Sequence, residues 1–250
     1  MNIVLEKMGT MLARFLTKPH SSYDLFSSID PSQLRHCLEP GDLLLVEGKS
    51  RISTAIQYLT QSTWSHVCFY TGPGQDNAGE LIEADLVEGV IRVPLSKYAG
   101  YNLRICRPIR LSEEDRRATI EFVLAREGYR YDLRNVIDLL RYLMPTPPVP
   151  LNYRRQLIAL GSGDPTRAIC STLVAQAFQS IKYPILPREV QVSLGHSPTH
   201  CDNVVLESRH FSHFTPRDFD LSPYFEVVKP TIKGHFDYKK IVWFEEDATL

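Results

Sequence analysis

The chain has 250 residues, enough for one large domain or two small ones, and 43% of them are hydrophobic, so a substantial core can form. Its formal net charge is −1, with both signs mixed along the sequence and no basic stripe, which argues against nucleic-acid binding. The five cysteines are scattered and form no C-x-x-C pair, which argues against a disulfide framework and favours a reducing compartment.

The N-terminal residues 2–17 bear on where the protein resides. Glu6 and Lys7 interrupt the region where a signal peptide has its apolar core, and no stretch reaches the ~20 apolar residues of a membrane span. We therefore expect a soluble, cytoplasmic protein. Residues 2–17 are amphipathic at helical spacing and are expected to pack on the protein's own core. The alternative is an interfacial helix that contacts a membrane surface, which would make the protein peripheral to the membrane.

The next segments predict an α+β domain built on an antiparallel sheet. Residues 19–38 are polar and are expected to be irregular, which divides the chain into an N-terminal helix and linker at 1–37 and one domain at 38–250. A helix is predicted over 50–58. Apolar or alternating runs separated by turn residues predict a meander of strands. The predicted strands are 43–46, 66–70, 81–85, 89–95 and 102–108.

Helices are expected to dominate the second half of the chain. One begins at Ser112, with two glutamates at its positive end, and another covers residues 135–144. A proline-rich break follows at 145–150. Two late strands are predicted at 224–228 and 240–243.

A further helix over 168–178 contains a candidate nucleophile. Asp164 is suited to be its N-cap and Pro165 its first residue, which places Cys170 in or near the first turn. The free N–H groups and the positive end of a helix lower the pKa of a thiol there. The ordinary alternative is that Cys170 is a small buried residue that packs the helix.

A nucleophilic cysteine needs a base and a group that orients the base. His66 opens a predicted strand directly after a turn, and Glu83 lies on the following strand. A carboxylate beside an imidazole selects the tautomer of the ring and raises its basicity. Asp85 shares the face of Glu83 and competes for this role. A histidine packed in the core and a solvated glutamate are the ordinary alternatives.

The order of these motifs resembles that of the YiiX/YebB-like cysteine hydrolases, a circularly permuted branch of the NlpC/P60 papain-like superfamily. The matching segments are Leu38-Glu39-Pro40-Gly41-Asp42, Ser65-His66-Val67, Ile82-Glu83-Ala84, Tyr131-Asp132, Cys170-Ser171-Thr172-Leu173-Val174, Thr215-Pro216-Arg217-Asp218 and Phe225-Glu226-Val227-Val228. The resemblance implies a papain-like core in which an antiparallel sheet packs on the nucleophile helix, with extra helices around it. It also implies a permuted order, because the cysteine helix follows the histidine strand.

The same resemblance assigns roles to individual residues. It implies that Cys170 is the nucleophile, His66 the base and Glu83 the orienting residue, and that Tyr131 borders the site. No metal or other cofactor is implied. The family usually has an acidic residue two positions after the cysteine, where this chain has Thr172. The segment 136–160 is longer than the family requires and is expected to cover the site as a lid or to extend an apolar substrate groove.

The resemblance implies a hydrolase that cleaves an amide or (thio)ester bond through an acyl-enzyme, on a lipid-like or N-acyl substrate. The alternative is a lipid acyltransferase or a non-catalytic lipid-binding protein of the same fold. A third hypothesis is a metal-binding or structural module, because five late residues have zinc-ligand chemistry. They are His196, His200, Cys201, His210 and His213. Pro198 argues against a regular helix that presents the first two of them.

Overall fold

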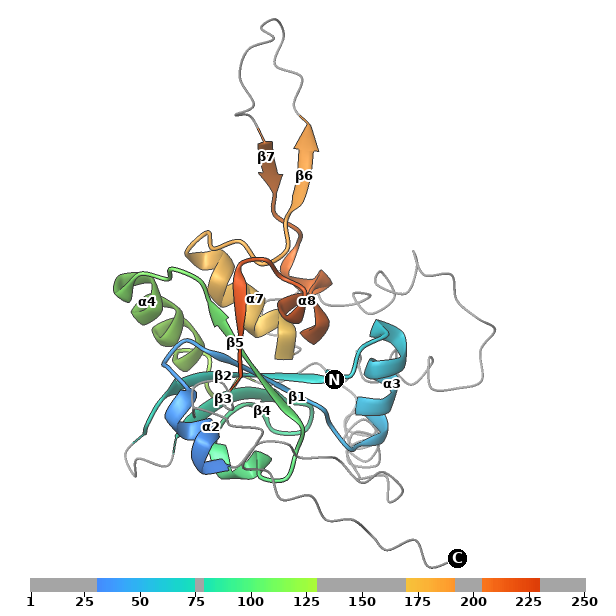
Figure 1. Ribbon diagram of the computed structural model, residues 1–250, viewed down its shortest axis with the longest axis vertical. Coiled ribbons are helices and arrows are strands. Elements are labelled where there is room, and N and C mark those ends of the chain that lie inside the picture. Colours follow the sequence, from blue (N-terminus) through green and yellow to red (C-terminus); the bar gives the residue numbers. More distant parts are fainter. Residues whose placement is uncertain (1–30, 75–78, 130–169, 192–203, 230–250) are drawn as a thin grey trace, which may run out of the picture.

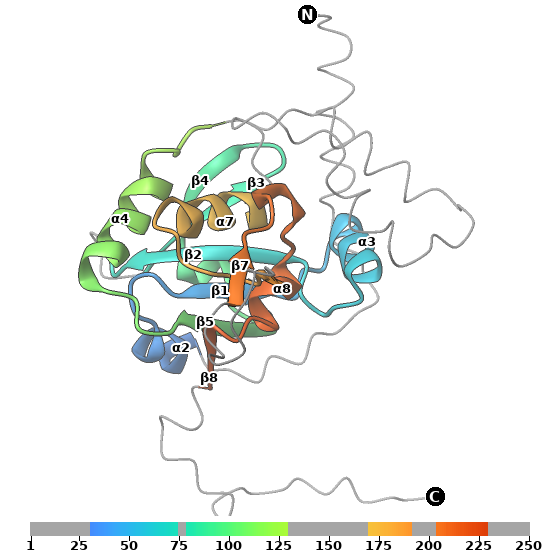
Figure 2. The same ribbon diagram turned by 90° about the horizontal axis from the view of Figure 1, so that it is seen from above.

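The computed structural model describes residues 31–74, 79–129, 170–191 and 204–229. A six-stranded antiparallel sheet with the strand order β4-β3-β2-β1-β5-β8 forms its centre (Figures 1 and 2). The sheet strands are β1 (Leu43–Val46), β2 (His66–Gly72), β3 (Glu80–Asp85), β4 (Gly89–Pro94), β5 (Leu103–Pro108) and β8 (Phe225–Val228). A separate hairpin of β6 (Arg188–Gln191) and β7 (Val204–Glu207) projects away from the sheet in Figure 1.

Helices cover both faces of the sheet. On one face lie α4 (Glu113–Leu124) and α7 (Cys170–Ser180), and Figure 2 shows α7 crossing over the sheet near β2 and β3. The short helices α2 (Pro31–Cys37) and η1 (Leu95–Tyr98) pack on the opposite face. Helix α3 (Arg51–Thr60) lies beyond the ends of β1 and β2, while η2 (Phe211–His213) and α8 (Pro216–Asp220) adjoin α7.

Strand β1 separates two hydrophobic cores. Its side chains alternate between the faces, so that Leu43 and Leu45 join the core under α4 and α7, and Leu44 and Val46 join the core under α2 and η1. All four are at most 1% exposed. A strand buried on both faces reads as a continuous apolar run, which is why Leu-Leu-Leu-Val was recognisable in the sequence.

The larger core is built around aromatic rings. Phe178 of α7 packs edge-on to Phe225 of β8, with ring centroids 5.1 Å apart, and lies 6.1 Å from Phe69 of β2. Such aromatic pairs stabilise a core by about 0.5–1.5 kcal/mol beyond their buried area. These contacts hold α7 against the middle of the sheet and so position its first residue, Cys170.

The α+β class and the antiparallel pairing are confirmed, but the predicted five-stranded meander is only partly right, because β5 pairs with β1 and not with β4. The five strands expected between residues 43 and 108 form, and the late strand predicted at 224–228 forms as β8, which pairs Val228 with Ile105 of β5. The helix boundaries also follow from capping chemistry. Ser50 and Ser112 precede α3 and α4, and the side-chain oxygen of each accepts a hydrogen bond from a backbone N–H three residues later.

The prediction of irregular structure over 19–38 is wrong for residues 31–37, which form α2. Leu34 and Cys37 are three positions apart and so lie on the same side of the helix, where both are buried in the core under the sheet. Tertiary packing therefore stabilises a helix that is too short to form on its own. The elements predicted at 2–17, 135–144 and 240–243 lie outside the described residues.

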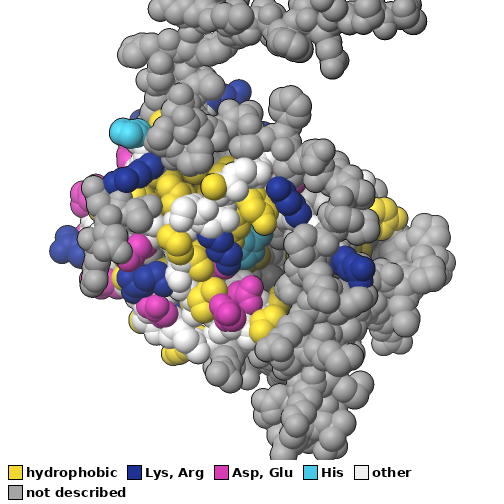
Figure 3. Space-filling model, turned by 90° about the horizontal axis from the view of Figure 1, so that it is seen from below, with side chains coloured by type: hydrophobic (Ala, Val, Ile, Leu, Met, Phe, Trp, Pro, Cys, Tyr) yellow, Lys and Arg dark blue, Asp and Glu magenta, His cyan; other side chains and the backbone are white. Residues whose placement is uncertain are grey.

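The surface agrees with the nearly balanced charge of the chain. On the face drawn in Figure 3, basic and acidic side chains are interspersed with hydrophobic ones. Among the described helices, none combines the length and the apolar character needed to cross a membrane.

Candidate active site

His66 is the first residue of β2, at the end of the sheet where the chain arrives from α3. It pairs with Val46 of β1, and its side chain is 22% exposed. Strand alternation directs Cys68 to the core under α2 and η1 and Val67 to the core under α7. His66 therefore lies at the end of β2, directly before the residues that enter the two cores.

Glu83 of β3 is the carboxylate that faces His66. Its Oε2 atom lies 3.4 Å from Nε2 of His66, and its side chain is only 1% exposed. The ammonium of Lys97 donates to Oε1, and the hydroxyl of Tyr98 donates to Oε2. Burial on its own raises the pKa of Glu83, but the hydrogen bonds and charges of these three neighbours outweigh burial and lower the pKa to about 2.

Cys170 is the first residue of α7 and reaches His66 from the other side. The thiol lies close enough to His66 and to the backbone N–H groups of Val67 and Ser171 for all three to influence its ionisation. Burial opposes ionisation of the thiol, but the charge of His66 and these donors outweigh it and lower the pKa of Cys170. Both the helix start and the histidine therefore favour the thiolate.

The imidazole of His66 is stabilised in its protonated form. Burial on its own lowers the pKa of His66, but the adjacent sulfurs of Cys68 and Cys170 outweigh it and hold the pKa well above its usual value. A thiolate–imidazolium pair with a buried carboxylate behind the ring is the arrangement used for nucleophilic catalysis by cysteine.

The structure brings Cys170, His66 and Glu83 together, although they come from three separate elements. Asp85, the competing carboxylate, is used elsewhere, because its Oδ1 accepts the backbone N–H groups of Val87 and Glu88 at 2.7 and 2.9 Å and closes the β3–β4 turn. Tyr131 lies outside the described residues.

Three neighbours of Glu83 had no assigned role in the sequence. Lys97 and Tyr98 belong to η1, where the sequence predicted that the strand from Gly89 runs on to Leu95. Cys68 donates to Oε2 of Glu83 at 3.6 Å. Cys68 lies two positions after His66 in β2 and so on the same face of the strand. No local sequence pattern indicates that the 3₁₀ helix η1 places the donors of Lys97 and Tyr98 against Glu83 of β3.

The start of α7 also contains an unpaired hydroxyl. Ser171 donates to the backbone carbonyl of Phe214 at 2.7 Å, whereas Oγ1 of Thr172 is buried and has no hydrogen-bond partner among the described residues. Thr172 stands where the resembling family has an acidic residue. An acidic residue buried at this position would need a hydrogen-bonding or charged partner. The hydroxyl of Thr172 has no such partner among the described residues.

His66, Cys68 and Glu83 also have donor atoms suited to a metal. One ligand atom from each lies within 4.8 Å of the others, and a nitrogen, a sulfur and an oxygen would leave one position of a tetrahedral Zn²⁺ open. The ammonium of Lys97 beside Glu83 opposes a divalent cation, and both carboxylate oxygens already accept hydrogen bonds. The donor atoms of these three residues are therefore of the kinds that bind a metal, whereas the positive charge of Lys97 beside them is unfavourable for a cation.

The late histidines are not part of such a group within the described residues. His210 is hydrogen-bonded through Nδ1 to the hydroxyl of Ser212 at 2.7 Å, and its ring centroid lies 5.9 Å from that of His213. His196, His200 and Cys201 lie outside the described residues.

Comparison with solved structures assigns the architecture to a YiiX-like α+β fold. The crystal structure of the metalloprotein yiiX from Escherichia coli O157:H7 is similar with a TM-score of 0.50 and 18% sequence identity, over 77% of this chain and 97% of that one. A scan against protein-family models and a search of the curated proteins each give no match. The predicted resemblance to YiiX is thereby confirmed at the level of the fold.

Proposed function

We propose that the protein is a cysteine hydrolase that cleaves an amide or (thio)ester bond through an acyl-enzyme. The observation that supports this most is that His66 faces the buried Glu83 carboxylate and also lies beside the Cys170 thiol at a helix start, where it lowers the pKa of that thiol. In this interpretation the fold is a circularly permuted papain-like core of the NlpC/P60 type, with the cysteine helix after the histidine strand.

The chemistry would proceed in two half-reactions. The Cys170 thiolate attacks the carbonyl carbon of the substrate, and the oxyanion that forms is stabilised by backbone N–H donors, of which that of Cys170 is the first choice. The imidazolium of His66 protonates the leaving amine, alcohol or thiol, which leaves a thioester on Cys170. Neutral His66 then takes a proton from water, the hydroxide attacks the thioester, and the carboxylic acid departs as the thiolate is regenerated.

Glu83 would act through His66. Its carboxylate, held by Lys97 and Tyr98, orients the ring and stabilises the imidazolium. A lipid-like or N-acyl substrate, and contact between residues 2–17 and a membrane surface, belong to this proposal as expectations. An acyltransferase would share the first half-reaction and differ only in using an amine or an alcohol in place of water.

The test is to incubate the wild type and two single variants with a panel of acylated amides, esters and thioesters. Cys170→Ala should abolish turnover and the acyl mass increment on the protein, whereas Cys37→Ala, which removes a thiol of α2 outside the site, should keep both. Mass spectrometry of the intact protein and of the Cys170 peptide gives the readout. Undiminished hydrolysis by Cys170→Ala of a substrate that the wild type turns over would rule out the proposal.

A metal centre at His66, Cys68 and Glu83 is the second candidate. It is favoured by the closeness of the three donor atoms and by the description of yiiX as a metalloprotein. A bound Zn²⁺ would supply Lewis-acid chemistry or an activated water there. Metal analysis of protein purified without a His tag should then find about one zinc per chain in the wild type and much less in Cys68→Ala. Less than about a tenth of a zinc per wild-type chain would eliminate this candidate.

A further inference from the structure

A cavity of about 670 Å³ lies between α3, the start of β2, β5 and α8. Its size is within the range of small-molecule sites, ~300–1,000 Å³. Polar groups line part of the walls, namely the amides of Gln57 and Gln61 and the hydroxyls of Thr54, Ser62 and Thr63, and apolar surface forms the larger part. The cavity can therefore hydrogen-bond a polar group and also pack against an apolar part of the same ligand.

Arg104 is held rigidly in the wall of this cavity. It forms an ion pair with Oδ1 of Asp220, and its guanidinium lies 4.9 Å from the ring centroid of Trp64. The indole N–H of Trp64 donates to Oδ2 of the same Asp220 at 3.1 Å. The side chain of Arg104 is still 39% exposed and lines the cavity, so some N–H donors of its guanidinium group are accessible to a ligand there.

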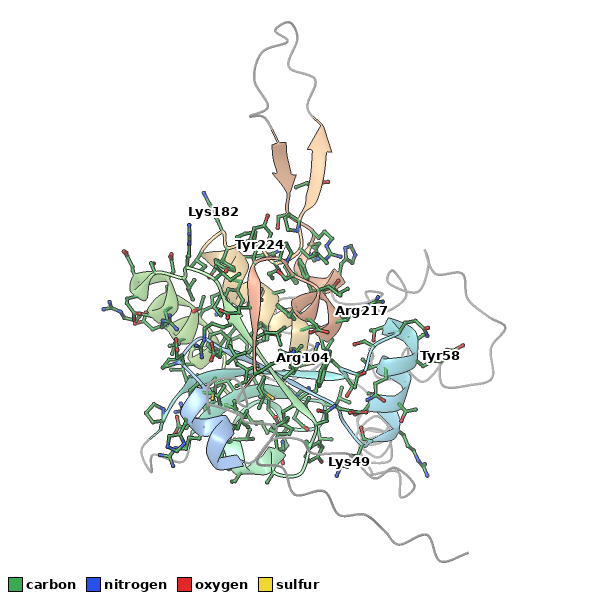
Figure 4. The ribbon with its side chains drawn as sticks, viewed as in Figure 1. Lys49, Tyr58, Arg104, Lys182, Arg217 and Tyr224 are labelled. Carbon is green, nitrogen blue, oxygen red and sulfur yellow. The ribbon has the colours of Figure 1, made fainter. Side chains whose placement is uncertain are left out.

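Two more cations line the cavity. Arg217 of α8 donates one N–H to the carbonyl of Thr60 at 2.9 Å, and the Lys49 ammonium lies 4.8 Å from the ring centroid of Tyr101. Within the described ranges, neither of the two is paired with a carboxylate. Figure 4 shows Arg104, Arg217 and Lys49 on the side of the sheet toward α3.

The acidic residues of the cavity do not balance these cations. Asp220 is already engaged by Arg104 and Trp64, and Glu47 accepts a hydrogen bond from the side chain of Asn102 at 2.9 Å. Three cations against two occupied carboxylates leave the cavity with a positive charge. In a partly enclosed space, such a charge attracts an anion more strongly than it would in open solvent.

The lining of the cavity includes Trp64, two positions before the residue that we propose as the base, but not that residue itself. Trp64 precedes His66 by two positions, and the hydroxyl of Ser65 accepts the backbone N–H of Gly48, a cavity residue, at 2.9 Å. A group bound in the cavity would therefore contact the segment that leads into β2, whose first residue is His66.

We propose that this cavity binds an anionic group, a carboxylate or a phosphate, at the polar end of the substrate. Guanidinium groups match both anions in geometry because they donate two parallel hydrogen bonds. The identification of the ligand as a substrate rests on the proposed hydrolase function, whereas the anion site rests on the cavity alone. The substrate class is then an acylated amino acid or an acylated phosphate-bearing head group, cleaved between the acyl part and the anionic part.

The test uses the full chain with Cys170→Ala, so that no probe is consumed. Three probes are titrated: N-acetylglycine, its neutral isostere N-acetylglycinamide, and inorganic phosphate. The readout is the NMR signal of the Trp64 indole N–H, distinguished from that of Trp243 by Trp64→Phe. We expect N-acetylglycine or phosphate to shift this signal. An equal shift should require a concentration of the neutral amide at least about tenfold higher. Which anion acts at the lower concentration distinguishes the two substrate sources.

Matched variants assign the effect to the cavity. Lys49→Gln and Arg217→Gln should each weaken anion binding by about tenfold. Lys182→Gln should bind as the parent does, since Lys182 lies at the α4 and α7 end of the molecule, away from α3 (Figure 4). Lys49→Gln remains decisive should Arg217→Gln fail to fold. Equal binding of acid and amide, or equal weakening by Lys182→Gln, would overturn the inference.

The same experiments separate this inference from the proposed function. Anion binding without any acyl-enzyme in the wild type would refute the hydrolase and leave the anion site standing. An acyl-enzyme without anion binding would overturn the anion site and support the hydrolase.

Discussion

At the scale of single residues, His66 joins groups of opposite character. On one side is the Cys170 thiol, whose ionisation it favours, and on the other is Glu83, whose charge favours a protonated ring. Each partner stabilises the charged form of the next, so the three side chains form a coupled unit. Removing one member should consequently change the ionisation of the others.

The reactivity of Cys170 should depend on His66. Because the pKa of Cys170 is lowered in the folded protein, its thiolate is present at a lower pH than that of an ordinary cysteine. His66→Gln removes the favourable charge and should shift the alkylation midpoint of Cys170 upward by about one pH unit or more. The rate of iodoacetamide labelling of the Cys170 peptide against pH measures this.

Cys106 is the internal control for the labelling experiment. It is buried, and burial raises the pKa of Cys106 to about 12, so it should stay unlabelled in both proteins. An unchanged midpoint for Cys170 in His66→Gln would show that the histidine does not activate the thiol.

Tyr98 is expected to position Glu83 rather than to contact substrate. Tyr98→Phe leaves a buried carboxylate oxygen with one donor fewer, which should lower the free energy of unfolding by about 1–3 kcal/mol. The pKa of Glu83 should rise, because the hydroxyl stabilises its charged form. The acid limb of the pH–rate profile should therefore move to higher pH, with kcat/KM lower by about tenfold at neutral pH.

Tyr101→Phe provides the comparison for Tyr98→Phe. Tyr101 packs edge-on against Tyr98, with ring centroids 5.5 Å apart, and is not among the hydrogen-bond partners of Glu83 in the described part of the chain. Removal of the Tyr101 hydroxyl in Tyr101→Phe should therefore not shift the acid limb of the pH–rate profile. A profile that moves equally in both variants would mean that packing of η1, and not the hydroxyl of Tyr98, is responsible.

At the scale of elements, the Pro-Gly-Asp turn before β1 has a structural role. Gly41 has φ of +94°, which a side chain would strain, and its N–H donates to the carbonyl of Tyr70. Asp42 is fully buried and accepts two hydrogen bonds from Arg107, at 2.9 and 2.7 Å. Arg107 also donates to the carbonyl of Cys37, so this motif joins α2, β1 and β5.

Asp42→Asn should destabilise the protein strongly without affecting the chemistry directly. It leaves the half-buried Arg107 without its buried counter-charge, and breaking a buried ion pair costs about 3–5 kcal/mol. Urea unfolding at neutral pH measures the loss. Glu113→Gln removes an exposed ion pair with Arg116 and should change stability by less than about 1 kcal/mol. Similar losses in both variants would contradict a special role for the turn.

At the scale of the whole molecule, the site depends on two cores that meet at one end of the sheet. The core under α7 brings Cys170 to His66 from a distant part of the chain, and the core under η1 brings Lys97 and Tyr98 to Glu83. The stability of the fold and the ionisation of the site residues are therefore linked. The change in the free energy of unfolding with pH is thus a measure of how these residues ionise.

Part of the acid stability should be due to Glu83. Its pKa of about 2 in the folded protein lies below the ordinary value of 4.5, so its contribution is present above about pH 4.5 and is lost as the pH falls toward 2. The difference corresponds to about 3 kcal/mol at most. Urea unfolding at pH 6 and pH 3 should show a smaller drop in stability for Glu83→Gln than for the wild type. The drop in Glu113→Gln should match the wild type, and an equal drop in Glu83→Gln would show that Glu83 does not contribute.

The features that could be predicted from the sequence are those that depend on residues close to one another along the chain. The run Leu43–Val46, the alternation in β2, and the capping serines Ser50 and Ser112 each reflect a local geometric rule. The sequence alone also identified Cys170, His66 and Glu83 as candidates, because a thiol at a helix start and an imidazole at a strand start are local features, and the order of the motifs resembled a known family.

Only the tertiary structure decided between Glu83 and Asp85, recruited Lys97 and Tyr98, and converted residues 31–37 into a packed helix. It also formed the cationic cavity, in which Trp64 bonds to Asp220, 156 positions away. These outcomes depend on contacts between side chains that lie far apart in the sequence. No local pattern encodes them, because burial and electrostatics are set by whatever the folded chain places nearby.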